Sequence, residues 1–169
     1  MQVIQEISKQ HDRKQFDCGQ PDLNRFLAQT ARQQSNKLIA RTYVLVDDES
    51  PKIIQGFYTL TFFPVDAPED SPLYNKYGKQ LSALKLARLA VDKAHQGNGY
   101  GNDLLIDAFC RASMAYRAAP IIGLFVDAKD TQAKDFYQPY GFSQVNQNEH
   151  LHLWLPIGTV LEVAEAAGG

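Results

Sequence analysis

The stretch that decides the fold is Gln96-Gly97-Asn98-Gly99-Tyr100-Gly101, which lies between a strand-like run, residues 86–91, and a helix-like run that begins at Asn102. Three glycines in six residues leave backbone N–H groups without side-chain cover where a helix begins. Uncovered N–H groups and the positive end of the helix dipole favour phosphate binding at such a turn. We therefore predict that this glycine turn, residues 96–101, binds a phosphate group. The alternative is a turn that only joins a strand to a helix.

The glycine turn has the spacing of neither common nucleotide motif. No Lys-Ser or Lys-Thr pair follows its last glycine, and the dinucleotide pattern G-x-G-x-x-G does not occur in it. Its pattern is similar to Gln/Arg-x-x-Gly-x-Gly/Ala, the pyrophosphate loop of the GNAT acyl-CoA transferases.

Length and composition predict one soluble globular domain over residues 1–169, with a frayed tail from about residue 160. The 169 residues are 44% hydrophobic and 21% charged, with a net charge of −2. These values allow a real core and give no global sign of nucleic-acid binding. The first residues lack the features of a signal peptide, and no apolar run has transmembrane length. Because Cys18 and Cys110 are the only cysteines and no C-x-x-C occurs, we expect a reduced, cytoplasmic protein without a disulfide framework or a zinc site.

Hydrophobic periodicity predicts a mixed α/β chain in which antiparallel hairpins flank a parallel strand–helix–strand crossover. The expected strands are residues 3–7, 42–46, 53–63, 85–91, 121–126 and 151–155. The expected helices are residues 21–36, a helix from Asn102 with Leu104, Leu105, Ala108, Phe109 and Ala112 on one face, and a short helix capped by Asp130 and ended by Pro139 and Gly141.

Two further features concern the third strand and the segment after it. Gly56 is expected to mark a bulge or a close backbone approach. Prolines in residues 64–82 argue against long regular structure in the first half of that segment.

Four motifs together resemble those of one GNAT branch, the toxins that acetylate charged tRNA. They follow the family's order and spacing and span most of the chain. The motifs are Phe16-Asp17-Cys18-Gly19 before a helix, Leu86-x-Arg88-Leu89-Ala90-Val91, the glycine turn, and Val126-Asp127-Ala128 leading to Phe136-Tyr137-x-x-Tyr140-Gly141-Phe142. The resemblance implies the GNAT fold, a mostly antiparallel mixed sheet whose parallel fourth and fifth strands splay apart to hold acetyl-CoA.

The resemblance also implies how acetyl-CoA is bound as a co-substrate, without a metal. Backbone groups of Leu89, Ala90 and Val91 would meet the pantetheine arm and the thioester carbonyl, and Phe136 would line the same site. The pyrophosphate would lie against Gln96, Gly97, Asn98, Gly99, Tyr100 and Gly101.

Tyr137 would be the acid that protonates the departing thiolate, with Tyr140 as its rival. An amine that attacks a thioester creates an oxyanion, which a preorganised backbone N–H stabilises. A tyrosine hydroxyl near the thiolate can supply the proton. No residue stands out as the base for the amine, although an α-amino group with a pKa of about 7.7–8.0 is already partly neutral.

Basic residues in two acid-poor stretches are the candidate tRNA contacts. Residues 23–46 contain no acidic residue, and Asp92 is the only acidic residue in residues 76–93. Phosphate binding would use the basic side chains Lys37, Lys79, Lys85 and Arg88. Solvated basic faces are the alternative.

Several side chains have a plainer explanation than chemistry. Cys18 has no evident His/Asp partner set and is expected to be a structural thiol. His150 and His152 have the spacing of two ligands on one strand face, but no third ligand accompanies them, so no metal site is predicted. Asp127, Lys129 and Asp130 fit capping and solvation as well as contact with CoA.

We predict an acetyl-CoA-dependent N-acetyltransferase toxin that acetylates the α-amine of aminoacyl-tRNA and so blocks translation. Its expected partner is a ribbon–helix–helix antitoxin, and a homodimer is possible. One alternative is a GNAT enzyme for a small amine or a protein amine. Another is a CoA-binding corepressor that acts with a DNA-binding antitoxin.

Overall fold

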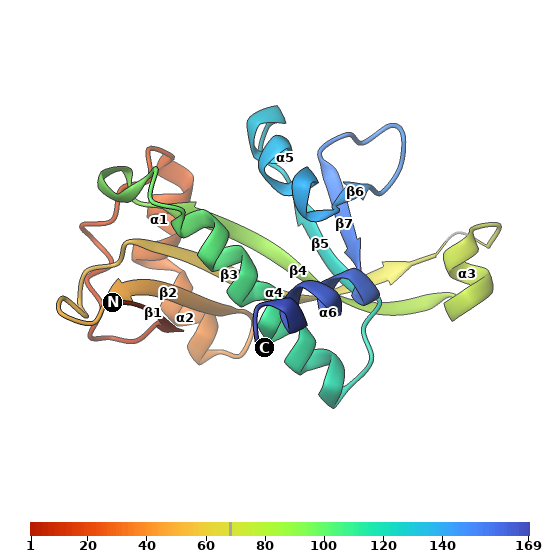
Figure 1. Cartoon of the computed structure of the whole chain (residues 1–169), viewed down its shortest axis with the longest axis horizontal. Helices are drawn as coiled ribbons and strands as arrows, with labels where there is room; N and C mark the ends of the chain where they lie inside the picture. Colours follow the sequence, from red (N-terminus) through yellow and green to blue (C-terminus); the bar gives the residue numbers. More distant parts are fainter. Residues whose placement is uncertain (68) are drawn as a thin grey trace. The chain divides into compact units, whose positions relative to one another are not determined.

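The computed structural model describes residues 1–67 and 69–169, and its chain divides into two compact units (Figure 1). Unit 1 comprises Met1–Thr61 and Ala87–Ala108, and unit 2 comprises Phe62–Leu86 and Phe109–Gly169. Hydrogen bonding orders the strands β1-β2-β3-β4-β5-β7-β6 in a mixed seven-stranded sheet. In the described ranges, no helix is both long and apolar enough to cross a membrane.

Unit 1 contains the antiparallel strands that precede the crossover. Strand β1 (Gln2–Glu6) pairs with β2 (Arg41–Asp47), which in turn pairs with the first half of β3 (Gly56–Asp66). The prediction that β3 begins at Ile53 was wrong. Residue Ile53 instead forms a parallel bridge with Asp12, and the Ile53 N–H donates to the Ser50 carbonyl oxygen in a turn.

The predicted helix over residues 21–36 is two helices, α1 (Pro21–Gln29) and α2 (Ala31–Asn36). Thr30 separates them because its backbone, at φ −121° and ψ −37°, leaves the helical range. The apolar face nevertheless continues across the break, since Leu27 and Ala31 are both fully buried. Periodicity predicted the buried face correctly but not the interruption.

One hydrophobic core holds unit 1 together. It joins the start of the chain, α1, α2, β2, β3 and the end of β4 (Gln80–Val91) through Ile7, Phe16, Phe26, Leu27, Ala31, Val44, Val46, Ile54, Phe57 and Ala90. Phe57 is its aromatic centre, with ring centroids 5.4 Å from Phe16 and 6.2 Å from Phe26. The first motif, residues 16–19, is therefore anchored by a core aromatic.

The proline-containing segment is more regular than predicted. Strand β3 continues through Pro64 to Asp66, because alternate residues from Thr61 to Val65 are half-buried while those between them face solvent. Helix α3 (Pro72–Tyr77) follows, capped by Ser71, whose hydroxyl oxygen accepts from the Tyr74 N–H at 3.1 Å. Strand β4 begins at Gln80, five residues before the predicted start at Lys85.

The rest of unit 2 is built around β5 (Gly123–Asp127). It pairs in parallel with β4 and antiparallel with β7 (His152–Pro156), which also pairs with the two-residue β6 (Ser143–Gln144). The parallel crossover is thus confirmed, whereas β6 was not predicted. The predicted short helix is α5 (Thr131–Tyr137), where the Asp130 carboxylate accepts from the Ala133 N–H at 2.8 Å.

The C-terminal tail is helical rather than frayed. Helix α6 (Ile157–Ala166) has Val160 and Ala164 completely buried, so packing supplies the stability that its length alone would not. The crossover helix α4 (Tyr100–Ala118) starts at Tyr100, two residues before the predicted Asn102. All five residues of its predicted apolar face are 0% exposed.

Candidate active site

The backbone of the glycine turn adopts a conformation that suits its glycines. Gly97 and Gly99 adopt φ of +85° and +81°, in the left-handed region that favours glycine. An added Cβ at either glycine would meet nothing within 4 Å, so both face open space. The helix's hydrogen-bonding pattern begins at Asp103, whose N–H donates to the Gly99 carbonyl oxygen at 3.1 Å. The amides before it lie at the positive end of a 19-residue helix, where a phosphate binds favourably.

Two polar side chains hold the glycine turn in shape. The Gln96 side-chain amide donates to the Val91 carbonyl oxygen at 3.0 Å, and it also reaches the Cys18 carbonyl oxygen at 3.5 Å. The Asn98 side-chain amide donates to the His95 carbonyl oxygen at 3.0 Å. The glutamine at the first position of the motif therefore has a structural role, because Gln96 connects the turn to the end of β4.

Asp17 connects the first motif to the segment that leads into the glycine turn. Its carboxylate accepts from the Gly19 N–H and from the Asn24 side-chain amide, both at 2.9 Å, and lies 3.0 Å from the Lys93 ammonium. The hydrogen bond from the Gly19 N–H, followed by Lys93 and Asn24, lowers the pKa of Asp17 to about 2. The sequence identified this motif only by resemblance, and the structure shows that it positions the approach to the turn.

The end of β4 is the strand expected to meet the acyl-CoA arm. Ala90 is buried, while Leu89 and Val91 are half-buried. Gly56 on β3 approaches this strand closely, since an added Cβ would lie 3.1 Å from the Ala90 carbonyl oxygen and 2.9 Å from Leu104 Cδ1. Of the two roles expected for Gly56, the structure shows the close approach.

The β4–β5 ladder covers only part of β4. It runs from the pair Leu84–Leu124 to the pair Leu86–Val126, although β4 continues for five more residues to Val91. Backbone groups of residues 87–91 are consequently not used in that ladder.

Tyr137 lies in the aromatic cluster of unit 2. Its ring centroid is 5.1 Å from that of Phe136 and 5.5 Å from that of Phe142, and its side chain is 6% exposed. Burial raises the pKa of Tyr137 above its ordinary value, so the hydroxyl stays protonated near neutral pH.

The Tyr137 hydroxyl is nevertheless reachable. Within the described part of the chain, no fully buried side-chain oxygen or nitrogen lacks a hydrogen-bond partner. The same residues supply no partner for the Tyr137 hydroxyl, so that oxygen keeps some contact with solvent. The protonated hydroxyl therefore holds the proton that a general acid needs. Tyr140, the rival, is half-buried, with its ring 6.0 Å from Phe109 and 5.8 Å from Phe136.

The predicted phosphate-contacting side chains fall into two groups. Lys37 and Lys79 are exposed, and no ion pair involves them among the residues that the structure describes. Lys85 instead lies 2.5 Å from the Asp127 carboxylate and over the Phe63 ring, 5.0 Å from its centroid. Arg88 stacks on Phe26 at 3.7 Å, and burial lowers its pKa. Lys37 and Arg88 belong to unit 1, and Lys79 and Lys85 to unit 2.

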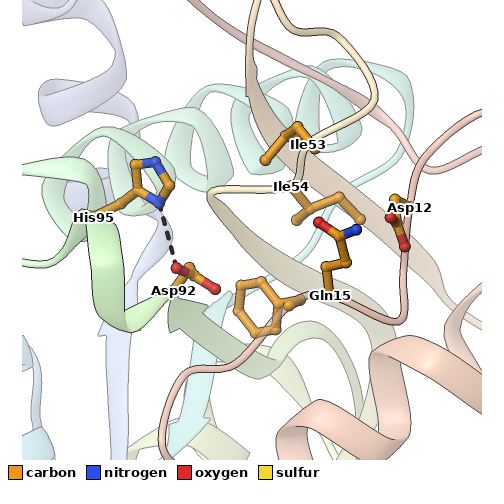
Figure 2. A pocket seen from close by; sticks show the side chains of 7 residues that line it. Asp12, Gln15, Ile53, Ile54, Asp92 and His95 are labelled. Atoms are coloured by element: carbon orange, nitrogen blue, oxygen red, sulfur yellow. Dashed lines mark hydrogen bonds and ion pairs between the residues drawn. The ribbon is translucent and has the colours of Figure 1, made fainter.

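A small cavity of about 140 Å³ lies beside the segment that precedes the glycine turn (Figure 2). His95 and Asp92 line one side and are joined by a 3.3 Å contact, while Asp12, Gln15 and Ile54 lie across from them. The cavity is smaller than pockets that enclose a drug-sized ligand, which are about 300–1,000 Å³. Asp92 also accepts hydrogen bonds from the Asp17 and Ala94 N–H groups. These contacts stabilise the segment before the turn.

The two histidines considered as metal ligands do not share a strand face. His150 lies in the turn before β7, and His152 is the first residue of that strand. The His152 Nδ1 atom lies 2.8 Å from the Asp127 carboxylate, at the directly paired position on β5. The sequence analysis treated His152 and Asp127 separately and did not predict this contact between them.

A parallel β4–α4–β5 crossover with a glycine turn at the start of its helix is consistent with an acyl-CoA transferase. The chain belongs to the GNAT acetyltransferases: the model of the acetyltransferase (GNAT) domain matches residues 39–144.

Two relatives extend the similarity beyond that domain. A tRNA-acetylating toxin of Mycobacterium tuberculosis (strain ATCC 25618 / H37Rv) is 30% identical over 151 residues, which cover 88% of each chain. A probable toxin TacT of Sinorhizobium fredii (strain NBRC 101917 / NGR234) is 28% identical over 160 residues, covering 89% of this chain and 87% of the relative.

Solved structures of similar proteins match almost the whole of this chain. A tyrosine-to-phenylalanine mutant of KacT has a TM-score of 0.87 at 29% identity, with coverage of 96% of this chain and 98% of that one. AtaT complexed with acetyl-methionyl-tRNAfMet has a TM-score of 0.85 at 28% identity, with coverage of 96% and 99%. A tyrosine-to-phenylalanine mutant of AtaT bound to the C-terminus of the antitoxin AtaR and to acetyl-CoA has a TM-score of 0.82 at 27% identity, covering 96% and 97%.

Proposed function

We propose that this protein is a toxin that transfers an acetyl group from acetyl-CoA to the α-amine of an aminoacyl-tRNA. The observation that carries the proposal is the similarity to a tRNA-acetylating toxin over 88% of both chains. The solved complex of AtaT with acetyl-methionyl-tRNAfMet, at 28% identity, supports the same acceptor class.

Acetyl-CoA fits the residues of the glycine turn. Its pyrophosphate would meet the backbone N–H groups that precede the first hydrogen bond of α4, where Gly97 and Gly99 leave room. Asp103, in the first turn of α4, would face solvent-screened repulsion from that pyrophosphate, which the helix dipole and the amides must outweigh. Backbone groups of residues 89–91 would bind the pantetheine arm and orient the thioester.

Tyr137 would act as the general acid. The amine nitrogen attacks the thioester carbonyl carbon, a backbone N–H stabilises the oxyanion, and the C–S bond then breaks. The Tyr137 hydroxyl gives its proton to the thiolate as the thiolate leaves. Because burial raises the pKa of Tyr137, the hydroxyl carries its proton at neutral pH, so a proton is available when the C–S bond breaks.

An RNA acceptor requires basic side chains that are not already neutralised. Lys37 and Lys79 meet this condition among the described residues, since both are exposed and neither takes part in an ion pair there. Lys85 does not, because Asp127 already neutralises its ammonium group. We therefore assign the first phosphate contacts to Lys37 and Lys79.

A partner protein is the remaining part of the proposed function. AtaT has been solved with the C-terminus of its antitoxin AtaR. By analogy, a cognate antitoxin of the ribbon–helix–helix type would bind this chain and suppress its activity. Co-expression with the neighbouring reading frame, followed by light scattering of the complex and of the chain alone, would report both the antitoxin and any homodimer.

The acceptor is tested by incubating the protein with labelled acetyl-CoA and, separately, charged tRNA, uncharged tRNA and a polyamine mixture. We expect label on charged tRNA alone, released by mild alkali as acetyl-amino acid. Lys79→Glu should raise the KM for charged tRNA and reduce its dependence on salt, while acetyl-CoA affinity stays unchanged. Lys52→Glu is a matched control, since it makes the same charge reversal at an exposed lysine outside the two acid-poor stretches. Label confined to polyamines would overturn the proposed acceptor.

A further inference from the structure

A histidine–carboxylate pair in unit 2 lies outside the residues assigned so far. Asp127 ends β5, and each of its carboxylate oxygens has a partner from a neighbouring strand. Oδ2 lies 2.5 Å from Lys85 Nζ on β4, and Oδ1 lies 2.8 Å from His152 Nδ1 on β7. The strand register places His152 directly opposite Asp127, whereas Lys85 pairs with Phe125 and reaches Asp127, two residues further along β5, diagonally. Three strands thus hold one carboxylate and orient one imidazole.

This geometry decides which imidazole nitrogen carries the proton. An ionised carboxylate only accepts hydrogen bonds, so His152 Nδ1 must carry the hydrogen that points to Asp127. In the neutral ring, Nε2 then keeps its lone pair. The Glu149 carboxylate lies 4.0 Å from Nε2, which is too far for a hydrogen bond. The pair therefore presents a proton acceptor.

The pair borders a cavity of about 210 Å³ with a mixed lining. Its apolar walls include Phe63, Phe125 and Leu153, and the first two rings pack with centroids 5.3 Å apart. Its polar lining is acidic apart from the histidine, since Asp66 and Glu149 join Asp127 and His152. Apolar walls with negative charge suit a ligand that carries an ammonium group next to an apolar portion. An aminoacyl group has this chemistry.

The charges around His152 come from every strand that meets the cavity. Lys85 on β4 offsets Asp127 on β5, whereas Asp66 on β3 and Glu149 before β7 add negative charge. The side chains of His152 and Asp127 are 49% and 46% exposed. A proton taken up by the imidazole can therefore pass to water.

We infer that His152 is the general base that removes a proton from the α-amine of the acceptor, and that Asp127 is the residue that positions it. This inference rests on the proposed function and supplies the proton acceptor that the sequence did not indicate. The N–C bond forms as the amine proton passes to His152 Nε2, and the C–S bond breaks as Tyr137 protonates the thiolate. His152 then releases its proton to water and Tyr137 regains one, so one amine and one thioester give one amide and one thiol.

If the His152–Asp127 pair had only a structural role, its loss would have a small effect on the reaction rate, and that effect would not depend on pH. A half-exposed ion pair contributes little stability, and its loss would leave the pH profile of the reaction unchanged. A general base instead contributes about 10²–10⁴-fold to the rate and sets a pH-dependent limb. Kinetics as a function of pH therefore separates the two roles.

The test uses the full chain with saturating acetyl-CoA and charged tRNA. The variant His152→Asn keeps an N–H that can reach Asp127 but lacks the basic Nε2. We expect its kcat to fall by about 10²–10⁴-fold with little change in KM for the tRNA. The difference in kcat between His152→Asn and the wild type should become smaller as the pH rises from about 6 to 8, because the free amine then deprotonates in solution.

Matched variants distinguish the loss of a catalytic base from the loss of folded structure. His150→Asn changes the neighbouring exposed histidine, which lies in a turn, and should behave as the wild type. Asp127→Asn should lower kcat, because an amide can stabilise the wrong tautomer of the imidazole. Thermal unfolding and acetyl-CoA affinity of each variant should match those of the wild type closely. A His152→Asn variant that is folded and has a kcat within about threefold of wild type would overturn the inference.

Failure of the proposed function has a different signature. If the wild type acetylates another amine but not charged tRNA, the proposed acceptor is wrong, and the same pH profile is then measured with the amine that is used. If the wild type acetylates charged tRNA and His152→Asn shows the wild-type pH profile, only the role of His152 is refuted.

Discussion

Substitution of Gly99 tests the assignment of the glycine turn directly. Gly99 has φ of +81°, and an added Cβ would meet nothing within 4 Å. A larger side chain therefore causes no clash. It lowers the free energy of unfolding only because a residue with a Cβ must adopt the left-handed backbone conformation, which costs about 1–2 kcal/mol. For a chain of this size such a loss lowers Tm by roughly 2–8 °C, so Gly99→Gln and Gly99→Glu should both fold.

The two variants separate shape from charge at the phosphate site. Gln and Glu have nearly the same size, but Glu adds a negative charge beside the amides that would hold the pyrophosphate. At a separation of about 4 Å, like charges repel by about 1 kcal/mol in water and about 4 kcal/mol at an effective dielectric constant of 20. The turn is open to solvent, so we expect Gly99→Glu to bind acetyl-CoA about 10–100-fold more weakly than Gly99→Gln.

Isothermal titration calorimetry with acetyl-CoA, at low and high salt, measures this ratio. The ratio should shrink as salt screens the added charge. Gly168→Glu is the matched control, since Gly168 also has a positive φ, +85°, and open space around it but lies at the C-terminus. Equal affinities for the folded Gly99→Gln and Gly99→Glu variants would refute the assignment of the turn as the pyrophosphate site.

Three further outcomes follow from the described contacts. Tyr137→Phe should keep the ring packing and acetyl-CoA affinity but lower kcat by about 10²–10⁴-fold, because it removes the proton donor; a normal turnover rate in steady-state kinetics would assign the acid elsewhere. Gly56→Ala should destabilise the fold by about 1–3 kcal/mol in urea unfolding, since its Cβ would lie 2.9 Å from Leu104 Cδ1, and an unchanged midpoint would contradict this close approach. The pKa of Asp17 is lowered to about 2 from 3.8, so its contribution to stability is complete above the unfolded value and is lost as the pH falls toward 2. Asp17→Asn should therefore reduce the loss of stability between about pH 4 and 2, measured by urea midpoints, and an identical pH dependence in both proteins would count against this hydrogen-bond network.

Local chemistry made several features predictable from the sequence. The positive φ of Gly97 and Gly99, the Asp130 cap and the buried face of α4 each depend on residues within a few positions of one another. Such features follow from backbone sterics, short-range hydrogen bonds and helical period. The parallel crossover could also be predicted, since a strand, a glycine turn, a helix and an apolar strand in succession allow few arrangements.

Tertiary packing decided where other elements begin and end. Pro64 signals a break, yet β3 continues through it because the half-buried residues on either side, Phe63 and Val65, pack against the unit 2 core. The Ala-rich C-terminus has little helical stability of its own, but burial of Val160 and Ala164 stabilises α6. These outcomes depend on partners that are distant in the sequence.

The polar contacts between strands are the part that only the tertiary structure could show. Lys85, Asp127 and His152 are separated by tens of residues, and the sequence presents them as a candidate tRNA contact, a capping or CoA-contacting carboxylate, and one of two closely spaced histidines. The β4–β5–β7 register brings them together around one carboxylate. Register depends on the pairing of whole strands, so the identity of any single residue carries no information about such a cluster. Composition and motifs therefore determined the class of chemistry, whereas strand pairing determined which charges are neutralised and which nitrogen can accept a proton.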